Sequence, residues 1–487
     1  MECGGHGCEI CTGSSCSCSS TGTRTTSSSW RQSKVCYKCK EAPAQVAANQ
    51  TEVLCAGCLN TSLFSKFKTA VNTYNLINPS DKVLLAFSGG PSSRVALDYI
   101  FEIWEKAKQD SLHCSEGSSR AFSFGVAYVD ESLIIPVHLS NPNKHCEELK
   151  SIVMEGSRRP DEFVIISIED VYTDAELDTT GECCSIHSNK LQRLQSLFKL
   201  VQDPTGKEDL LEHLRMQALQ QFARKHGYTR LVLGLSASRI AVKVISETAK
   251  GCGFSLPAGM QYYDGRWSVP VVLPLRDCIA KELVLLCHYR KLKWVFIPNM
   301  STLTLPQKSI TSLSSSFVST LQEDNPSRER TIMRTAAKLQ AFSFNHATAI
   351  DGHSSHKKSA SVPISAVIDE KEEIKDELLC LLCCAPLSPQ ESVSIVTAFQ
   401  ITESKRQQNG SLISDTKPST HFLEKCCQSC QYQFFPVEER TGEILSILPQ
   451  TMKNSEFLSE KVKQMWMRSQ INDCLLINSD SDDETVT

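Results

Sequence analysis

Hydrophobic residues between positions 63 and 300 follow two spacings in turn. Short continuous apolar runs, typical of strands buried on both faces of a sheet, lie at 83–87, 122–129, 163–168 and 230–235. Between them apolar residues recur every three or four positions, as on one face of a helix, over about 92–107, 190–201, 209–226 and 239–249. Strands that alternate with helices predict an α/β fold, a parallel sheet with helices on both of its faces.

Helical spacing continues on either side of this region, whereas the ends of the chain lack it. We expect further helices at 63–76, from Leu275 to about Tyr289, at 310–322 and at 328–342. Residues 1–34, rich in Cys, Ser and Thr, predict a disordered leader. The polar stretch 348–361 predicts an exposed insertion, and the acidic residues 478–487 a disordered tail.

Composition places the chain among globular proteins and bounds its partners. Of 487 residues, 41% are hydrophobic and 22% charged, which is enough apolar material for a sizeable core. The net charge of −4 means that any nucleic-acid contact must come from a local basic patch. No apolar run approaches the ~20 residues of a membrane span, and the N-terminus lacks a secretory signal pattern. We therefore expect a cytoplasmic protein without membrane contact, in a reducing compartment.

Cysteines in C-x-x-C pairs indicate metal binding in such a compartment. The first set has 15 residues between its pairs and consists of Cys36, Cys39, Cys55 and Cys58. The second has 43 residues between its pairs and consists of Cys380, Cys383, Cys427 and Cys430. Four thiolates complete a tetrahedron around zinc and leave no open position, so each site would be structural. The alternative is buried or redox-active cysteine pairs, and the neighbouring Cys384 and Cys426 blur the second assignment.

A glycine turn after the first strand of the α/β region predicts an anion site. The buried run 83–87 leads into the loop, and a helix follows. Backbone N–H groups of such a turn and of the helix N-terminus point at one place, where phosphate commonly binds. The candidate residues are Ser88, Gly89, Gly90, Ser92 and Ser93, with Asp130 at the end of the next strand. Alternatively, this is an ordinary tight turn and Asp130 a solvated strand end.

The order of motifs along the chain resembles a known family. A four-cysteine knuckle and a Ser-Gly-Gly loop precede the runs 129–131, 215–219 and 274–276, and a late cysteine set follows. This order resembles the ATP-dependent tRNA 2-thiolases, and more closely their partner, the cytoplasmic tRNA 2-thiolation protein 2 family. The resemblance covers about residues 35–300 well. It implies an adenine-nucleotide alpha-hydrolase-like fold with a degenerate pyrophosphate loop.

Departures from the thiolases fall on the groups that carry their chemistry. Ser92 stands where the loop of the thiolases has Asp, and Ser238-Arg239 replace an acidic pair. The positions of two sulfur-delivering cysteines are Glu208 and Leu211, and the run 293–298 lacks the third. Thiolation needs ATP, a metal to neutralise phosphate charge and thiolates to deliver sulfur. We therefore predict a subunit with no catalytic residues, and whether a nucleotide still binds stays open.

The resemblance also implies partners and a domain order. The partners are a catalytic thiolase, a tRNA whose wobble uridine is thiolated, and a ubiquitin-like thiocarboxylate carrier that supplies sulfur through the complex. The domains would be a leader (1–34), a zinc knuckle (35–62), the degenerate pyrophosphate-loop α/β domain (63–300), a helical extension with a polar insertion (301–375), a cysteine-rich module (376–477) and an acidic tail (478–487).

Basic and aromatic residues suggest where the tRNA would bind. Lysine and arginine neutralise phosphates, and an aromatic ring can stack on an unpaired base. The candidates are Arg215, Arg290, Lys291, Lys293 and Trp294, against the alternative of a solvated helix face. Two other functions remain open: an active ATP-dependent tRNA sulfurtransferase with unusual residues, and a zinc-ribbon anion-sensing protein unrelated to RNA.

Overall fold

The computed structural model forms two compact units, residues 1–55 and 56–487. It describes residues 35–47, 53–112, 121–135, 142–155, 159–172, 183–298, 300, 308–325, 327–346, 378–397, 422–436 and 438–453. The predicted leader, polar insertion and acidic tail lie outside these residues. In the first unit, the strands β1 (Val46–Ala47) and β2 (Val53–Leu54) form a small antiparallel pair.

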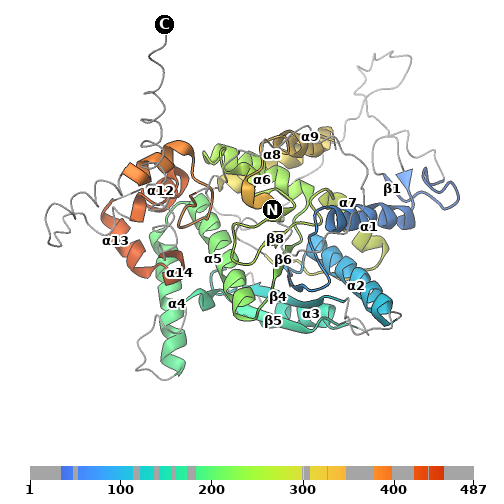
Figure 1. Ribbon diagram of the computed structural model, residues 1–487, viewed down its shortest axis with the longest axis horizontal. Helices are drawn as coiled ribbons and strands as arrows, with labels where there is room; N and C mark the ends of the chain where they lie inside the picture. The colour runs from blue at the N-terminus through green and yellow to red at the C-terminus, as the bar shows by residue number, and fades with distance from the viewer. Residues whose placement is uncertain are drawn as a thin grey trace, which may run out of the picture. The chain divides into compact units, whose positions relative to one another are not determined.

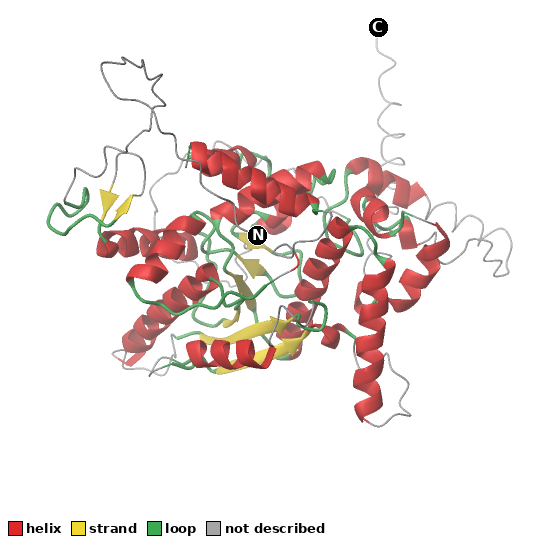
Figure 2. Cartoon of the chain, turned by 180° about the vertical axis from the view of Figure 1, so that it is seen from behind, coloured by secondary structure: helices red, strands yellow, loops and turns green. Residues whose placement is uncertain are grey.

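A six-stranded sheet is the centre of the second unit (Figure 2). Its order is β5 (Glu162–Ser167), β4 (Ser123–Asp130), β3 (Lys82–Ala86), β6 (Arg230–Leu233), β8 (Val271–Val272) and β7 (Tyr263–Asp264). All neighbours are parallel except β7, which runs antiparallel at the edge. The four predicted strands are confirmed and the fold is the predicted α/β class. The strands β7 and β8, of two residues each, are additions.

Helices cover both faces of this sheet (Figure 1). Their bounds are α1 (Ala56–Thr73), α2 (Pro91–Leu112), α3 (Pro142–Val153), α4 (Cys183–Leu200), α5 (Pro204–Lys225), α6 (Ala237–Ala249), α7 (Ala280–Tyr289), α8 (Ile310–Asp324), α9 (Arg328–Ala336), α12 (Gln428–Phe434), α13 (Glu438–Ile447) and α14 (Gln450–Lys453). Short 3-10 helices include η3 (Ile168–Val171). A helix is present in each predicted region, although α9 ends at Ala336 instead of at 342. The helices α3, α12, α13 and α14 are additions.

The expected start of α7 at Leu275 is wrong. Residues 273–278 form a buried turn instead, in which the N–H of Arg276 donates to the carbonyl of Leu273 and that of Cys278 to Leu275. The guanidinium of Arg276 donates to the carbonyl of Met260. These bonds satisfy the backbone without helical geometry, and the helix begins five residues later.

Alternating residues of β3 and β4 point to the two opposite faces of the sheet. Leu84 and Ala127 belong to a core formed with α4, α5, η3 and the C-terminal helices. Phe124 turns to the other face, where its ring meets the ring of Phe101 on α2 at 5.0 Å between centroids. Side chains alternate across a strand, so neighbouring positions serve different layers.

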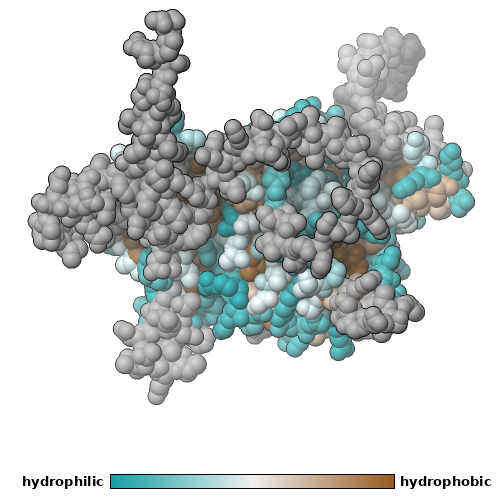
Figure 3. Space-filling view, viewed as in Figure 1, coloured by the Kyte–Doolittle hydropathy of each residue, from teal (hydrophilic) through white to brown (hydrophobic). Residues whose placement is uncertain are grey.

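The C-terminal helices are part of this second unit. α13 packs against α4 and α12 against α5 (Figure 1). Hydrophilic and hydrophobic residues are interspersed over the face shown in Figure 3. Among the described residues, every helix is too short or too polar to cross a membrane.

Candidate functional site

The glycine loop lies where the strand order of the sheet reverses. The loop joins β3, which ends at Ala86, to α2, which begins at Pro91. In the sheet, β3 has β4 on one side and β6 on the other, so the strand order runs in opposite directions from this point. Open α/β sheets bind ligands at such a switch point, beyond the carboxyl ends of the strands. Gly89 has a φ of +77°, which favours glycine. A Cβ on Gly234, at the end of β6, would lie 2.9 Å from Cα of Ser93, so this glycine permits the close approach.

The hydroxyl groups of the loop bond to one another. Oγ of Ser88 and Oγ of Ser93 are 3.2 Å apart, and Ser93 also donates to the carbonyl of Gly90 at 3.0 Å. At the end of β4, the Asp130 carboxylate accepts the N–H of Ser132 at 3.0 Å. The structure thus brings the predicted loop residues together, with Asp130 at the same edge of the sheet. Anion binding there remains a prediction.

Residues 292–298, which we call the strap, cover this loop. The N–H of Val295 donates to the carbonyl of Gly89 at 2.9 Å. A Cβ placed on Gly89 would lie 2.7 Å from Cδ2 of Leu149 on α3 and 3.5 Å from Cδ1 of Ile297. Apolar side chains and a backbone donor from the same chain therefore occupy the space beside Gly89. The sequence gives no signal for this contact, because the partners lie far apart in it.

Arg215 is held by a carboxylate at the end of β4. Its Nε and one terminal nitrogen both donate to the carboxylate of Glu131, the terminal one at 3.0 Å. Burial alone would lower the pKa of Arg215, but the Glu131 carboxylate outweighs burial and raises it. One edge of the guanidinium, formed by Nε and one terminal nitrogen, is thus held by Glu131, and the role of Arg215 in RNA binding remains a prediction.

The basic residues near α7 differ in their surroundings. Arg290 donates to Asp98 of α2, and to Oδ1 of Asn60 at 3.3 Å. Lys293 donates to Glu155 at 2.8 Å, and this bond lowers the pKa of the Glu155 carboxyl. Lys291 and Trp294 are exposed. The role of all four in RNA binding remains a prediction.

The positions that the resemblance matches to thiolase chemistry make contacts within this chain. Ser238 donates to Glu329 and accepts the N–H of Ala280 at 3.0 Å. Glu208 accepts the hydroxyl of Ser309, at the start of α8, and Leu211 is buried in the core. Glu208 thus binds the residue before α8, and Ser238 binds a residue of α9.

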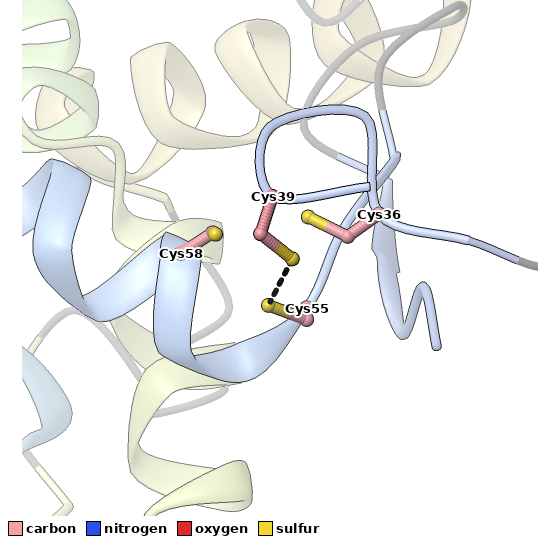
Figure 4. Close-up of side chains that lie close together, drawn as sticks. All are labelled: Cys36, Cys39, Cys55 and Cys58. Atoms are coloured by element: carbon pink, nitrogen blue, oxygen red, sulfur yellow. Dashed lines mark hydrogen bonds between the residues drawn. The ribbon is translucent and has the colours of Figure 1, made fainter. Parts of the chain in front are cut away.

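The first cysteine set forms a compact group of thiols. The sulfur atoms of all four lie within 4.8 Å of one another, and those of Cys39 and Cys55 are 3.9 Å apart (Figure 4). Lys40, with φ of 59°, turns the chain after the first pair, and Cys58 lies in the first turn of α1. Burial would raise the pKa of Cys36, but backbone N–H groups, largest among them that of Cys39, outweigh it and lower the pKa to about 6. Such donors favour the thiolate that a metal requires.

The second set is built in the same way. Its four sulfur atoms also lie within 4.8 Å of one another, and those of Cys383 and Cys427 are 3.7 Å apart. Cys384, with φ of 55°, turns the chain after the first pair, and Cys430 lies in the first turn of α12. The N–H of Cys427 donates to the sulfur of Cys380 at 3.3 Å.

Neither extra thiol of this region belongs to the four. Cys384 takes the turn position. The thiol of Cys426 donates to the carbonyl of Phe422 at 3.6 Å and also lies beside the sulfur of Cys380, but it is outside the group of four. Both predicted sets are therefore confirmed as groups that could hold a metal ion. Four sulfur donors and N–H bonds to sulfur fit a closed tetrahedral site.

Comparison with known proteins places the chain in a family. A cytoplasmic tRNA 2-thiolation protein 2 from Oryza sativa subsp. indica is 38% identical, with 92% of this chain and 90% of the relative aligned. The chain belongs to the cytoplasmic tRNA 2-thiolation protein 2 family. The Arabidopsis thaliana protein of that name is 36% identical over 93% of this chain and 92% of its own length. The human one is 29% identical over 62% and 67%.

The family model for cytoplasmic tRNA 2-thiolation protein 2 matches residues 309–434. Among solved structures, the U34-tRNA thiolase NcsA from Methanococcus maripaludis, with its 4Fe-4S cluster, aligns with 63% of this chain and 88% of its own. The two chains are 17% identical, and the TM-score is 0.45. Membership of the family rests on the sequence relatives.

Proposed function

We propose that this chain acts in 2-thiolation of the wobble uridine of cytosolic tRNAs, as a non-catalytic subunit. It pairs with a catalytic thiolase as a heterodimer in the cytoplasm, and the complex takes sulfur from a ubiquitin-like thiocarboxylate carrier. The chain assembles this complex and helps to bind tRNA. Support for the process comes from the family to which the chain belongs.

One observation carries the non-catalytic part of the proposal. Residues at the chemical positions are engaged in contacts within the chain: Glu208 with Ser309, and Ser238 with Glu329. An activation step needs carboxylates that hold a metal beside the phosphates. Ser92 and Ser238 supply hydroxyls there instead. We expect the isolated chain to release no pyrophosphate from ATP, with or without tRNA.

We propose that both cysteine sets hold zinc. Each offers four thiol ligands and leaves no open position for a substrate, so the ion would cross-link two segments of backbone. The backbone donors at Cys36 and Cys380 stabilise the charged thiolates that it needs. Iron is the alternative that metal analysis distinguishes.

Thiolation in cells tests the proposed function. The catalytic thiolase is expressed with and without this chain, and the fraction of thiolated wobble uridine is measured in bulk tRNA. We expect thiolation only when both are present. Normal thiolation in cells that lack this chain would refute the proposal. Robust pyrophosphate release by the purified chain alone would favour the active sulfurtransferase instead.

A further inference from the structure

The strap presents two aromatic rings on its outer side. Exposure alternates over residues 294–297: Trp294 and Phe296 are 43% and 63% exposed, whereas Val295 and Ile297 are partly covered. Alternation of this kind belongs to an extended segment, in which successive side chains point to opposite sides. Among the described residues, no ring–ring contact involves either aromatic.

The segment that carries these rings is anchored at several points. At its start, α7 ends in a Schellman motif: the N–H of Leu292 donates to the carbonyl of Cys287, and that of Lys291 to His288. Within the strap, Val295 is bonded to Gly89. A ligand that binds the rings therefore meets a segment already held in place, which lowers the entropy cost of binding.

The spacing of the two side chains along the strap suits one planar nucleobase between their rings. Side chains two positions apart on an extended chain project from points about 6.4–6.8 Å apart. A nucleobase stacks at about 3.4 Å from its neighbour on each side. One base between two rings thus needs about 6.8 Å. Stacking between aromatic side chains is a common way for proteins to hold unpaired bases of single-stranded RNA.

Positive charge adjoins the rings. Lys291 is exposed, and the described residues include no ion pair with it. Lys291 has a φ of 54°, in the left-handed region where glycine is usual at this position of a helix end. A lysine there accepts backbone strain and places a cation three residues before Trp294. This charge favours a polyanion over an apolar peptide as the occupant.

We propose that Trp294 and Phe296 hold one unpaired RNA base between their rings, with Lys291 bound to an adjacent phosphate. The identification of that RNA as tRNA rests on the proposed function. The stacking itself does not. The glycine loop then serves as the anchor of an RNA-binding strap.

Fluorescence of a modified RNA tests the stacking. The probe is an RNA hairpin with 2-aminopurine in its unpaired loop, titrated with the full chain, because stacking on a ring quenches this base. We expect Trp294→Ala and Phe296→Ala each to abolish quenching and to weaken binding roughly 5- to 150-fold. Lys291→Ala should keep the quenching and lower the slope of log K against log salt by about 0.7.

Phe317→Ala is the matched control, because Phe317 is an exposed phenylalanine on α8. It should bind and quench as the unaltered chain does. Equal quenching and affinity in Trp294→Ala, Phe296→Ala and unaltered protein would overturn the proposal. So would unchanged RNA affinity in Phe296→Ala with weaker capture of the thiolase, which would make the surface a protein interface. Stacking that is lost in both variants while thiolation proceeds without the chain would refute only the proposed function.

Discussion

Arg290, at the end of α7, is ion-paired with Asp98 of α2, and this contact ties two neighbouring helices together. Asp98 is buried, and its carboxylate also lies 3.9 Å from the guanidinium of Arg94 on the same helix. Lys291, the next residue, points to solvent. Arg290 and Lys291 are adjacent and both basic, but Arg290 pairs within the fold, whereas Lys291 is exposed to solvent.

Charge reversal at Arg290 should destabilise the fold. Arg290→Glu places a carboxylate beside Asp98, and we expect the free energy of unfolding to fall by about 2 kcal/mol. Urea unfolding followed by circular dichroism measures it. Arg290→Lys should lose less, since it keeps a cation beside Asp98. Equal stability of Arg290→Glu and the unaltered chain would show that the pair contributes nothing.

Lys291→Gly should separate stability from RNA binding. Glycine adopts the left-handed conformation at the end of α7 without strain, so we expect the free energy of unfolding to rise by about 0.5–1 kcal/mol. RNA affinity should fall because the cation is lost. Thermal unfolding and titration with the hairpin measure the two effects. Lys291→Ala, which keeps the strain, should lose affinity without the gain. A less stable Lys291→Gly would contradict the account of this residue.

The two glycines of the loop should respond differently to alanine. Gly89→Ala meets both a positive φ and Leu149, and we expect it to cost about 1–3 kcal/mol. A Cβ on Gly90 would meet only Oγ of Ser88, at 3.7 Å, so Gly90→Ala should be nearly neutral. Chemical unfolding compares the pair. A loop that binds phosphate would show a phosphate-dependent rise in melting temperature in the unaltered chain, and an ordinary tight turn would show none.

Metal content should distinguish neighbouring cysteines. We expect about two zinc ions per purified chain, about one in Cys383→Ser, and two in Cys384→Ser, because only Cys383 belongs to the four-thiol set. Mass spectrometry of the metals, with assay of inorganic sulfide, separates zinc from an iron–sulfur cluster. Iron with sulfide would overturn the zinc assignment, and equal loss in both variants would overturn the choice of ligands.

The sequence predicts those parts of the structure that local pattern determines. Continuous apolar runs such as 83–87 give the strands, and C-x-x-C spacing gives both cysteine sets, whereas only the structure separates Cys427 from its neighbour Cys426. The strand β8 escapes prediction because two residues carry no period. Turn chemistry accounts for the wrong start of α7, where Arg276 bonds to Met260 rather than continuing a helix.

Contacts between distant segments could not be predicted in this way. Glu131 and Arg215 are both visible in the sequence, but nothing local pairs residues 84 positions apart. The strap's contact with Gly89 depends likewise on the fold as a whole. The function of a basic residue turns on such partners, so composition alone could not rank Arg215, Arg290 and Lys291 as RNA contacts.

The two cysteine sets differ in how much chain must be made before each is complete. The first lies within residues 36–58, whereas the second needs residues 380–430 and helices that pack on α4 and α5. A site formed by near neighbours assembles early, and one that waits for distant segments assembles late. During synthesis the first set is therefore complete while most of the chain has yet to emerge. The second set can close around an ion only after residue 430 has been made.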